Sequence, residues 1–225
     1  MKQDIYCIIG PTGIGKTNYA INLAKQIGAE IISADAYQVY QYMDIGTAKP
    51  SKKELAEVPH HLIDIKRADE PYSLHDFLTL SENIIHQLRY QHKPIIICGG
   101  TALFMHAFLY SYSLPKAASK PETRQLLLNK YDQKGKEALW NELHDIDPVS
   151  ANSIHPNNKH HLLRALEIYY ISKEKPSDVK RRSQSIRADS KIIGLISDKE
   201  VVNQRIDLRV DKMIQSGLID EVKHL

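Results

Sequence analysis

The sequence predicts an α/β fold, a parallel sheet flanked by helices, together with an all-helical insertion domain. Short apolar runs of strand length alternate with segments at helical spacing in the first 114 residues and again after residue 187. A glycine-rich loop joins the first apolar run to the first helical segment. Between residues 115 and 186 no strand-like run occurs. We therefore expect a core formed by residues 1–114 and 187–225, with a helical insertion at 115–186.

Length and composition are those of an ordinary globular protein. The chain has 225 residues, of which 42% are hydrophobic and 25% charged. Its two cysteines, Cys7 and Cys98, lie in apolar runs and are expected to be buried free thiols. No run reaches the roughly 18 apolar residues that span a bilayer, and no signal peptide precedes the first run. We expect a cytoplasmic protein, and a net charge of +3 does not by itself indicate nucleic-acid binding.

The glycine-rich loop satisfies the phosphate-binding pattern G-x-x-x-x-G-K-[ST]. It consists of Gly10, Pro11, Thr12, Gly13, Ile14, Gly15, Lys16 and Thr17. An apolar run at 5–9 precedes it, and a helical segment at 18–27 follows. Glycine lets successive N–H groups point inward, and the start of a helix adds partial positive charge. Lys16 supplies a cation, and the Thr17 hydroxyl can hold a phosphate oxygen or Mg²⁺. The loop therefore predicts a P-loop NTPase-like core that binds linked phosphates, as ATP-binding and other nucleotide-binding proteins do, with Mg²⁺ as cofactor.

The second apolar run, residues 30–35, ends on a carboxylate, Asp35. In a parallel sheet the carboxyl ends of the strands face the ligand crevice, so Asp35 is expected on the same rim as the loop. The alternative is an aspartate that caps a helix or a turn. Residues 36–50 then interleave polar and aromatic side chains, including Tyr37, Tyr40 and Tyr42. These tyrosines suit stacking on nucleic-acid bases and suit a packed surface equally well.

Residues 60–101 predict two further strands and a helix. The run 60–65 resembles a short strand, and its two adjacent histidines would point to opposite faces, which disfavours joint metal binding. Ser73 begins a Ser-x-x-Asp cap before a helix, and 94–98 reads as a buried strand. A tight turn then leads into a helix at 102–110, which places Thr101 at a second strand-to-helix junction on the rim. This strand does not end in the aspartate usual in P-loop ATPases, so nothing is evidently arranged for hydrolysis.

The insertion is expected to start with a linker at 115–121. Helices follow at 122–143, with a break near Gly135, after the Asp147-Pro148 pair, and at 158–172. A basic run closes the insertion and comprises Lys173, Lys175, Lys180, Arg181, Arg182, Arg187 and Lys191. Such a run is either solvated surface or a contact for a polyanion.

The chain then returns to the sheet. Residues 191–196 predict a strand, and Asp198 opens a helix that ends at Gly217. Its inward face is expected to comprise Val202, Ile206, Val210, Met213 and Ile214. On the same helix Arg205, Arg209 and Lys212 form a cationic stripe, which either pairs with Asp207 and Asp211 or faces the phosphates held by Lys16.

Five segments together resemble the tRNA dimethylallyltransferase (IPP transferase) family, which places an isopentenyl group on the adenosine next to the anticodon. They are GPTGIGKT at 10–17, EIISADAYQVYQYMDIGTAKP at 30–50, GGTALF at 99–104, DPVSANSIHPNNKHHLLRALEIY at 147–169 and QRIDLRVDKMIQSGLIDEV at 204–222. The second segment is highly specific, because P-loop kinases do not share it.

The resemblance implies a reaction and roles for the residues. The diphosphate of dimethylallyl diphosphate would sit in the loop 10–17, held by Lys16, Thr17 and Arg209. The exocyclic amine of adenosine would attack the allylic carbon, with Asp35 as general base and Thr101 positioning Asp35 and the adenine. The substrates would be tRNAs that read codons beginning with U. The residues implied to contact tRNA are Asp35, Ala36, Tyr37, Gln38, Thr101, Arg124, His160, His161, Leu162, Leu163 and Arg164. A flipped-out adenosine is expected, since such chemistry needs an unstacked base.

The chain also departs from the family pattern. Asn158 stands where the family usually has Asp, His161 where it has Arg, and Lys199 where most members have Arg. The resemblance implies further helices beyond the segment at 204–225. The sequence ends at Leu225 before them, so we expect either that it is incomplete or that the protein lacks part of the usual tRNA-binding surface.

Three other functions stay open on the residues alone. A P-loop kinase of a small metabolite would share the loop and the fold, although the missing aspartate counts against it. An isopentenyltransferase on free adenine nucleotides would share the chemistry, and the helical insertion with its basic run favours tRNA over it. The third is an RNA-binding module without activity. Whichever function holds, we expect a monomer.

Overall fold

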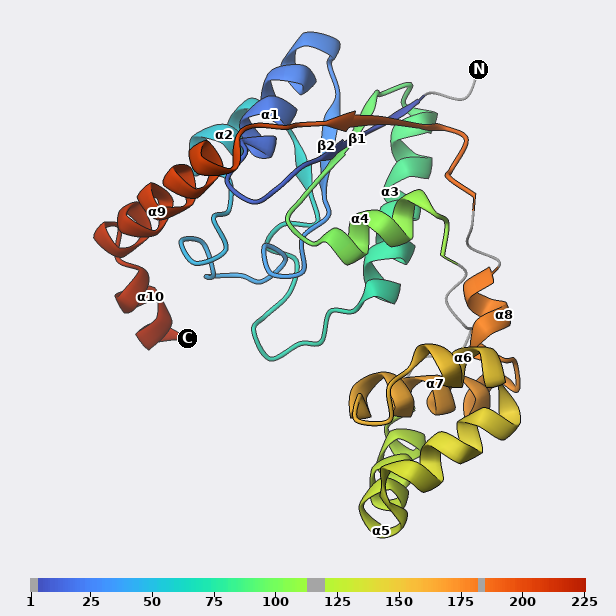
Figure 1. Ribbon diagram of the computed structural model, residues 1–225. Helices are drawn as coiled ribbons and strands as arrows, with labels where there is room; N and C mark the ends of the chain where they lie inside the picture. The colour runs from blue at the N-terminus through green and yellow to red at the C-terminus, as the bar shows by residue number, and fades with distance from the viewer. Residues whose placement is uncertain (1–3, 113–119, 182–184) are drawn as a thin grey trace. The chain divides into compact units, whose positions relative to one another are not determined.

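The computed structural model describes residues 4–112, 120–181 and 185–225 (Figure 1). The chain forms two compact units, one comprising Met1–Leu109 with Ile186–Leu225 and the other Tyr110–Ser185. The boundaries expected from the sequence were 114/115 and 186/187. Most of the expected linker at 115–121 lies outside the described residues.

The first unit is built on a five-stranded parallel sheet in the order β3-β2-β4-β1-β5. The strands are β1 (Ile5–Ile9), β2 (Glu30–Ser33), β3 (His60–His61), β4 (Ile95–Cys98) and β5 (Ser190–Gly194). In the register of the sheet, Ile97 lies beside both Cys7 and Ile32. All residues of β4 are buried, which explains its continuous apolar run, because a central parallel strand is covered on both faces.

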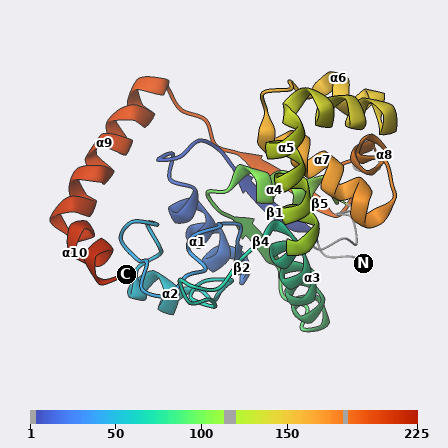
Figure 2. The same cartoon turned by 90° about the horizontal axis from the view of Figure 1, so that it is seen from below.

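Helices cover both faces of this sheet (Figure 1 and Figure 2). The helices of the first unit are α1 (Lys16–Ile27), α2 (Lys52–Glu57), α3 (Leu74–Tyr90), α4 (Ala102–Leu109), α9 (Lys199–Gln215) and α10 (Leu218–His224). Ala20, Ile21 and Ala24 of α1 pack on one face against Ile8 and Ile96. Side chains alternate along a strand, so the strand residues next to Ile8 and Ile96 point to the opposite face of the sheet. Helices α3 and α4 lie on that face.

Capping signals fix the start of two of these helices. Ser73 and Asp76 form the expected capping box at α3: Ser73 Oγ accepts from the Asp76 N–H, and the Asp76 carboxylate accepts from the Ser73 N–H. Ser51 and Glu54 form the same arrangement at α2. The sequence reading did not predict α2, although its Ser-x-x-Glu signal is equally clear.

Three local expectations are corrected. The strand expected at 60–65 is only two residues long, and the one expected at 191–196 runs from Ser190 to Gly194. On α9, Val210 and Ile214 were expected to face inward, but they are 46% and 53% exposed. Of the helix, only Val202 is buried. Helical periodicity shows which residues share a face, whereas burial also needs an element that covers that face.

The second unit is all-helical over its described residues, as the sequence predicts. Its helices are α5 (Pro121–Ile146), α6 (Pro148–Ser153), α7 (Lys159–Ser172) and α8 (Pro176–Arg181), the last of which was not expected. Gly135, with φ 81° and ψ 170°, interrupts α5 at the expected break. The core of this unit consists of Leu127, Leu139, Leu143, Ala151, Leu162, Leu163, Ala165 and Leu166.

Asp147, at the start of α6, connects two helices of the second unit. This residue is 1% exposed, and its Oδ1 accepts from the Ser150 N–H at 3.2 Å and the Ser177 hydroxyl at 2.9 Å. Its Oδ2 accepts from the Ser177 N–H at 2.8 Å, so one carboxylate caps α6 and fixes α8. Burial alone would raise the pKa of Asp147, but these hydrogen bonds outweigh it and lower the pKa.

Within the ranges 4–112, 120–181 and 185–225, none of the helices has the length and apolar character that crossing a bilayer requires.

Candidate active site

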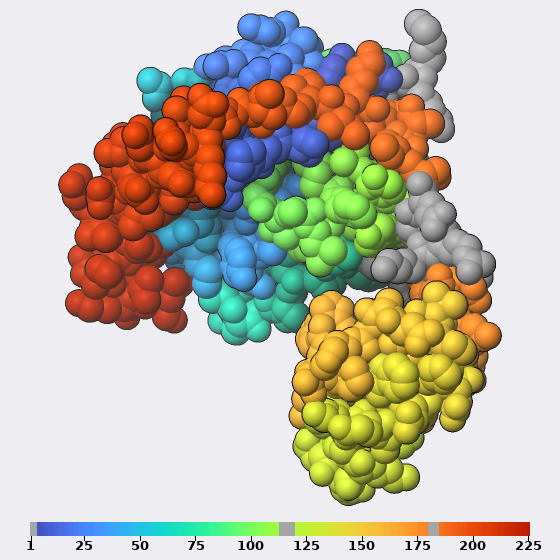
Figure 3. Space-filling view, viewed as in Figure 1, coloured from blue at the N-terminus to red at the C-terminus, as the bar shows by residue number. Residues whose placement is uncertain are grey.

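A cleft of about 1160 Å³ opens at the carboxyl ends of β1, β2 and β4 in the first unit. Its lining comes from the glycine-rich loop with the start of α1, the chain between Ile31 and Leu55, the segment from His60 to Asp64, the junction from Cys98 to Thr101, and one side of α9. The space-filling view shows the surface recessed between α9, the start of the chain and α4 (Figure 3). The cleft thus gathers the segments that the sequence predicted on one rim.

The glycine-rich loop curls as its pattern predicts. Gly13 has φ 80° and Gly15 φ 101°, both in the left-handed region that favours glycine. A Cβ on Gly13 would lie 2.8 Å from Cγ1 of Ile206, so α9 packs directly against the loop. Arg205 strengthens this contact, since its Nη1 donates to the Ile14 carbonyl at 3.2 Å. The loop therefore leads directly into α1 and packs against α9.

Lys16, the first residue of α1, reaches back over the loop. Its Nζ donates to the Gly10 carbonyl at 2.8 Å and the Pro11 carbonyl at 2.9 Å. Burial lowers the pKa of Lys16, and the positive charge of Arg209 lowers it further, while Cys98 and Asp35 act in the opposite sense. These couplings place the predicted cation and the predicted base in one electrostatic environment.

Asp35 lies in the turn that follows β2, with its carboxylate held by three backbone N–H groups. Oδ1 accepts from Tyr37 at 2.9 Å and Gln38 at 3.3 Å, and Oδ2 accepts from Gly100 at 3.0 Å. The two interpretations of Asp35 thus coexist, because it organises a turn and also lines the cleft. A carboxylate held in this way keeps a fixed orientation.

Thr101 fixes the backbone beside Asp35 and does not bind its carboxylate. Thr101 Oγ1 accepts from the Ala36 N–H at 2.9 Å, and the Thr101 N–H donates to the Ala34 carbonyl at 3.1 Å. Residues on either side of Asp35 are therefore bound to the same threonine, which begins the turn into α4.

The aromatic and amide residues after Asp35 take different positions. Tyr37 and Tyr42 are 65% and 79% exposed, whereas Val39 between them is buried. Gln38 is bound inside the turn: its Oε1 accepts from the Ser33 hydroxyl at 3.1 Å, and its Nε2 donates to the Thr47 and Ala48 carbonyls at 3.3 Å each. Exposed tyrosine rings beside a cleft are available for stacking on a base.

The cationic stripe on α9 faces the cleft. Arg205, Arg209 and Lys212 all line it. Asp207 and Asp211 take part in none of the ion pairs found among the described residues. Of the two alternatives for the stripe, the structure favours the one directed at the phosphate loop.

Cys98 also lines the cleft, at the end of β4. Burial raises the pKa of this thiol to about 12, with Lys16 lowering it and Asp35 raising it to a smaller extent. The thiol therefore stays protonated at neutral pH and is no nucleophile.

The residues of the second unit that are implied to contact tRNA divide into side chains that are at least partly exposed and side chains that lie in the core. Arg124 and Arg164 flank Glu167, which is 2% exposed, with N–O distances of 3.6 and 2.9 Å. His160 and His161 are exposed in the first turn of α7. Leu162 and Leu163, in contrast, are core residues, so the expectation of RNA contacts is corrected for their side chains. A contiguous range on a helix includes such buried neighbours, because successive residues are about 100° apart around the helix axis and some of them face the core.

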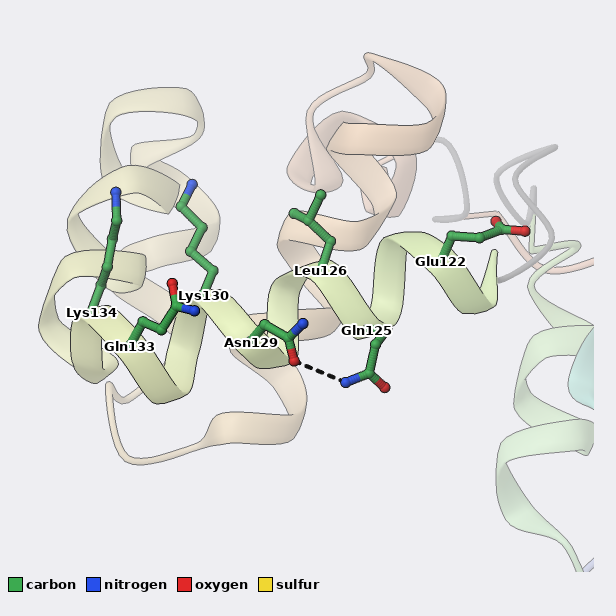
Figure 4. Close-up of a pocket in the computed structure, with 7 residues that line it drawn as sticks. All are labelled: Glu122, Gln125, Leu126, Asn129, Lys130, Gln133 and Lys134. Carbon is green, nitrogen blue, oxygen red and sulfur yellow. Dashed lines mark hydrogen bonds between the residues drawn. The ribbon is translucent and has the colours of Figure 1, made fainter.

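A further polar surface in this unit was not anticipated. The first half of α5 carries a shallow depression on one face (Figure 4), lined by Glu122, Gln125, Leu126, Asn129, Lys130, Gln133 and Lys134. Lys130 is held there by Glu142 of the same unit at 2.6 Å.

Of the basic run expected at the end of the insertion, Arg182 lies outside the described residues.

Metal binding by protein ligands alone finds no support in the parts of the chain that are described, since no group of three or more His, Cys, Asp or Glu side chains is arranged for it. The residues do fit a phosphate-bound Mg²⁺. This ion usually takes only one or two protein ligands and completes its shell with phosphate oxygens and water. The Thr17 hydroxyl, in the cleft beside Lys16, is the side chain that would serve.

Together these features define an α/β protein with a P-loop-like fold and a cleft at the carboxyl ends of its parallel strands, which Lys16 and Asp35 both line. The profile of the IPP transferase family matches residues 38–225. The chain belongs to this family.

Individual relatives agree with this assignment. A tRNA dimethylallyltransferase of Alkaliphilus oremlandii is 42% identical over 226 residues, covering 100% of this chain and 72% of the relative. Among solved structures, a full-length tRNA isopentenylpyrophosphate transferase of Bacillus halodurans is 38% identical with a TM-score of 0.67, covering 100% of this chain and 70% of that one. A eukaryotic dimethylallyltransferase acting on tRNA is 30% identical with a TM-score of 0.87, covering 100% and 56%.

Proposed function

We propose that the chain transfers a dimethylallyl group from dimethylallyl diphosphate to the exocyclic amine of the adenosine next to the anticodon, in tRNAs that read codons beginning with U. The observation that carries the proposal is the shared cleft, in which the Asp35 carboxylate and the Lys16 ammonium line one cavity. Family membership and the names of the relatives support the same activity.

In the proposed reaction the diphosphate is the leaving group. The amine nitrogen of adenosine forms a bond to the allylic carbon, and the bond from that carbon to the diphosphate oxygen breaks with its electron pair. The diphosphate would be bound, and the charge that develops on it stabilised, by Gly10, Pro11, Thr12, Gly13, Ile14, Gly15, Lys16, Thr17 and Arg209. Of these, Thr12, Gly13, Gly15, Lys16, Thr17 and Arg209 line the cleft. Mg²⁺ bound at Thr17 would neutralise part of that charge.

Asp35 would accept the proton that the amine loses. Its orientation is set by N–H groups of Tyr37, Gln38 and Gly100, and Thr101 fixes the backbone on either side of it. The same turn would contact the adenosine through Ala36, Tyr37 and Gln38. The base has to leave its stack to reach Asp35, and an exposed tyrosine can receive it.

In the second unit, Arg124, His160, His161 and Arg164 would bind the tRNA backbone. All four are at least partly exposed, and arginine side chains suit phosphate groups. The free cysteines Cys7 and Cys98 suit a reducing cytoplasm, and we propose that the chain acts as a monomer.

Incubation with labelled dimethylallyl diphosphate tests the function. Label should pass to tRNA and not to AMP, and ATP should not be consumed. Transfer to AMP would indicate an adenine-nucleotide enzyme, ATP consumption with a phosphorylated product a kinase, and tRNA binding without transfer an RNA-binding module.

Replacing Arg209 with alanine should weaken binding of dimethylallyl diphosphate more than binding of tRNA. A hydrogen bond to a charged group contributes about 1.5–3 kcal/mol, so we expect its KM to rise on the order of 10- to 100-fold. The KM for tRNA should change less than about twofold. Lys199→Ala is the control, since Lys199 is an exposed cation on the same helix and does not line the cleft. The reverse pattern of KM values would assign Arg209 to the RNA.

The depressed pKa of Lys16 predicts an alkaline limit to diphosphate binding. The charged ammonium is the binding form, so affinity is full below the Lys16 pKa and falls as pH rises through it. Because burial lowers this pKa, the fall should begin at lower pH than for an ordinary lysine. Titration calorimetry with inorganic diphosphate between pH 7 and 10 measures it. Lys16→Arg keeps its charge over this range and should lose the alkaline fall, whereas an identical fall in both proteins would assign it to another group.

A further inference from the structure

Glu221 of α10 binds three consecutive backbone N–H groups in a loop far away in sequence. Its Oε2 accepts from Asp44 at 2.8 Å and Ile45 at 2.7 Å, and its Oε1 accepts from Gly46 at 2.8 Å. Successive N–H groups that converge on one point form a concave anion site, and here a carboxylate of the same chain occupies it. Burial would raise the pKa of Glu221, but the three N–H groups outweigh it and hold the pKa below its ordinary value.

Apolar contacts reinforce this attachment. A Cβ on Gly46 would lie 3.2 Å from Cδ1 of Leu218, so the loop approaches α10 closely where glycine stands. On the other side, Ile45 Cδ1 lies 4.0 Å from the Cβ position of Gly217. The short helix therefore contacts the loop through its first turn and through Glu221.

The bound loop forms one wall of the cleft. Asp44, Ile45, Gly46, Thr47, Ala48 and Lys49 all line the cavity, whereas Glu221 does not. Lys49 also stabilises this loop. Its side chain is 3% exposed, and its Nζ donates to Asp44 at 2.6 Å and to Asp64 at 2.5 Å. Glu221 thus acts on the cleft from outside, by holding its lining.

A short path of hydrogen bonds leads from this loop to Asp35. The Thr47 and Ala48 carbonyls, directly after the N–H groups that Glu221 binds, accept from Gln38 Nε2. The Gln38 N–H in turn donates to Asp35 Oδ1 at 3.3 Å. A shift of the loop would therefore move Gln38, and with it one of the donors that orient the carboxylate.

We propose that Glu221 is a positioning residue for the acceptor side of the cleft. It fixes the loop 44–48 so that Gln38 and Asp35 meet the adenosine in a defined geometry, and it touches neither substrate. The inference rests on the proposed function and extends it to a residue outside the cleft. It accounts for a three-donor carboxylate site between segments about 175 residues apart in sequence.

The test compares Glu221→Ala and Glu221→Gln with the unmodified chain. A misplacement of about 1 Å at a reacting site can cost on the order of 100-fold in rate. We expect kcat/KM for tRNA to fall about 10- to 100-fold in Glu221→Ala, with the KM for dimethylallyl diphosphate within about twofold. Glu221→Gln should fall between, since an amide keeps one acceptor oxygen but turns an NH₂ group toward the remaining N–H.

Asp220→Ala is the matched control. Asp220 is the preceding residue on α10, is exposed and makes no side-chain contact with the loop among the described interactions, so its loss removes the same charge without the N–H contacts. Hydrogen exchange at the amides of Asp44, Ile45 and Gly46 gives a readout independent of activity. Faster exchange is expected in both Glu221 variants and in neither Asp220→Ala nor the unmodified chain.

Each outcome decides between the inference and the function on which it rests. If the unmodified chain transfers no label to tRNA, the proposed function fails. If it does, but Glu221→Ala keeps its kcat/KM for tRNA while its loop amides exchange faster, the positioning role fails alone. A rise in the KM for dimethylallyl diphosphate as large as the loss in kcat/KM for tRNA, or the same loss in Asp220→Ala, would also overturn it. Should the alanine variant not fold, Glu221→Gln decides by the same criteria.

Discussion

Asp35→Ala should lower transfer to tRNA by about 10²- to 10⁴-fold, the range that a positioned general base contributes, while diphosphate binding should change less than about twofold. The reason is the division of the cleft. The groups proposed to bind diphosphate lie on the glycine-rich loop, α1 and α9, and the carboxylate comes from the turn after β2. Loss of Asp35 therefore removes the proton acceptor and leaves the anion site in place.

Two measurements check this expectation. Single-turnover transfer reports the chemical step, and calorimetry with inorganic diphosphate reports the anion site. Asp35→Asn is the informative comparison, because the amide oxygen can still accept from Tyr37 and Gln38 and so preserves the turn. If Asp35→Asn transfers as fast as the unmodified chain, Asp35 serves the turn and another group accepts the proton. If both variants also lose diphosphate binding, the carboxylate belongs to the anion site.

Much of the fold could be predicted because its signals are local. The capping box at Ser73, the break at Gly135 and the cap at Asp147 each depend on residues within a few positions of one another. The rim position of Asp35 and Thr101 followed from a topological rule, that parallel strands present their carboxyl ends to one crevice. Neither inference needed to know which strands are neighbours.

The parts that could not be predicted depend on partners distant in sequence. In the sequence, Glu221 looks like an ordinary exposed acidic residue of a helix. Its contact with Gly46 exists only in the folded chain. Val210 and Ile214 have the spacing of a buried face but lie exposed, since spacing carries no information about a covering element. For Leu162 and Leu163 the difference is the opposite: a contiguous range was expected to contact RNA, but these two side chains lie on the core face of α7.

Gly99→Ala should damage both the fold and the site, because the chain that leaves β4 lies against the chain that leaves β2 without room for a side chain. A Cβ on Gly99 would lie 2.1 Å from the Ala34 carbonyl oxygen and 2.2 Å from its carbon. These are backbone atoms of the residue before Asp35, so no side chain can rotate away to relieve the overlap. The Ala34 carbonyl also accepts the Thr101 N–H, and moving it disturbs Asp35 and Thr101 together.

We expect Gly99→Ala to lower the free energy of unfolding by about 3 kcal/mol, the upper part of the range for overpacked sites. Transfer should fall at least about 100-fold even at temperatures where the variant is folded, since the carboxylate is displaced. Gly194→Ala is the matched control: this glycine ends another strand of the same sheet, and its Cβ position has no atom within 4 Å. Its stability should change by less than about 0.5 kcal/mol. Denaturant unfolding of both variants, followed by transfer assays, separates the effects. Equal stability of the two would show that Ala34 moves aside without cost, and a folded Gly99→Ala with full activity would show that the spacing of these two backbones does not position Asp35.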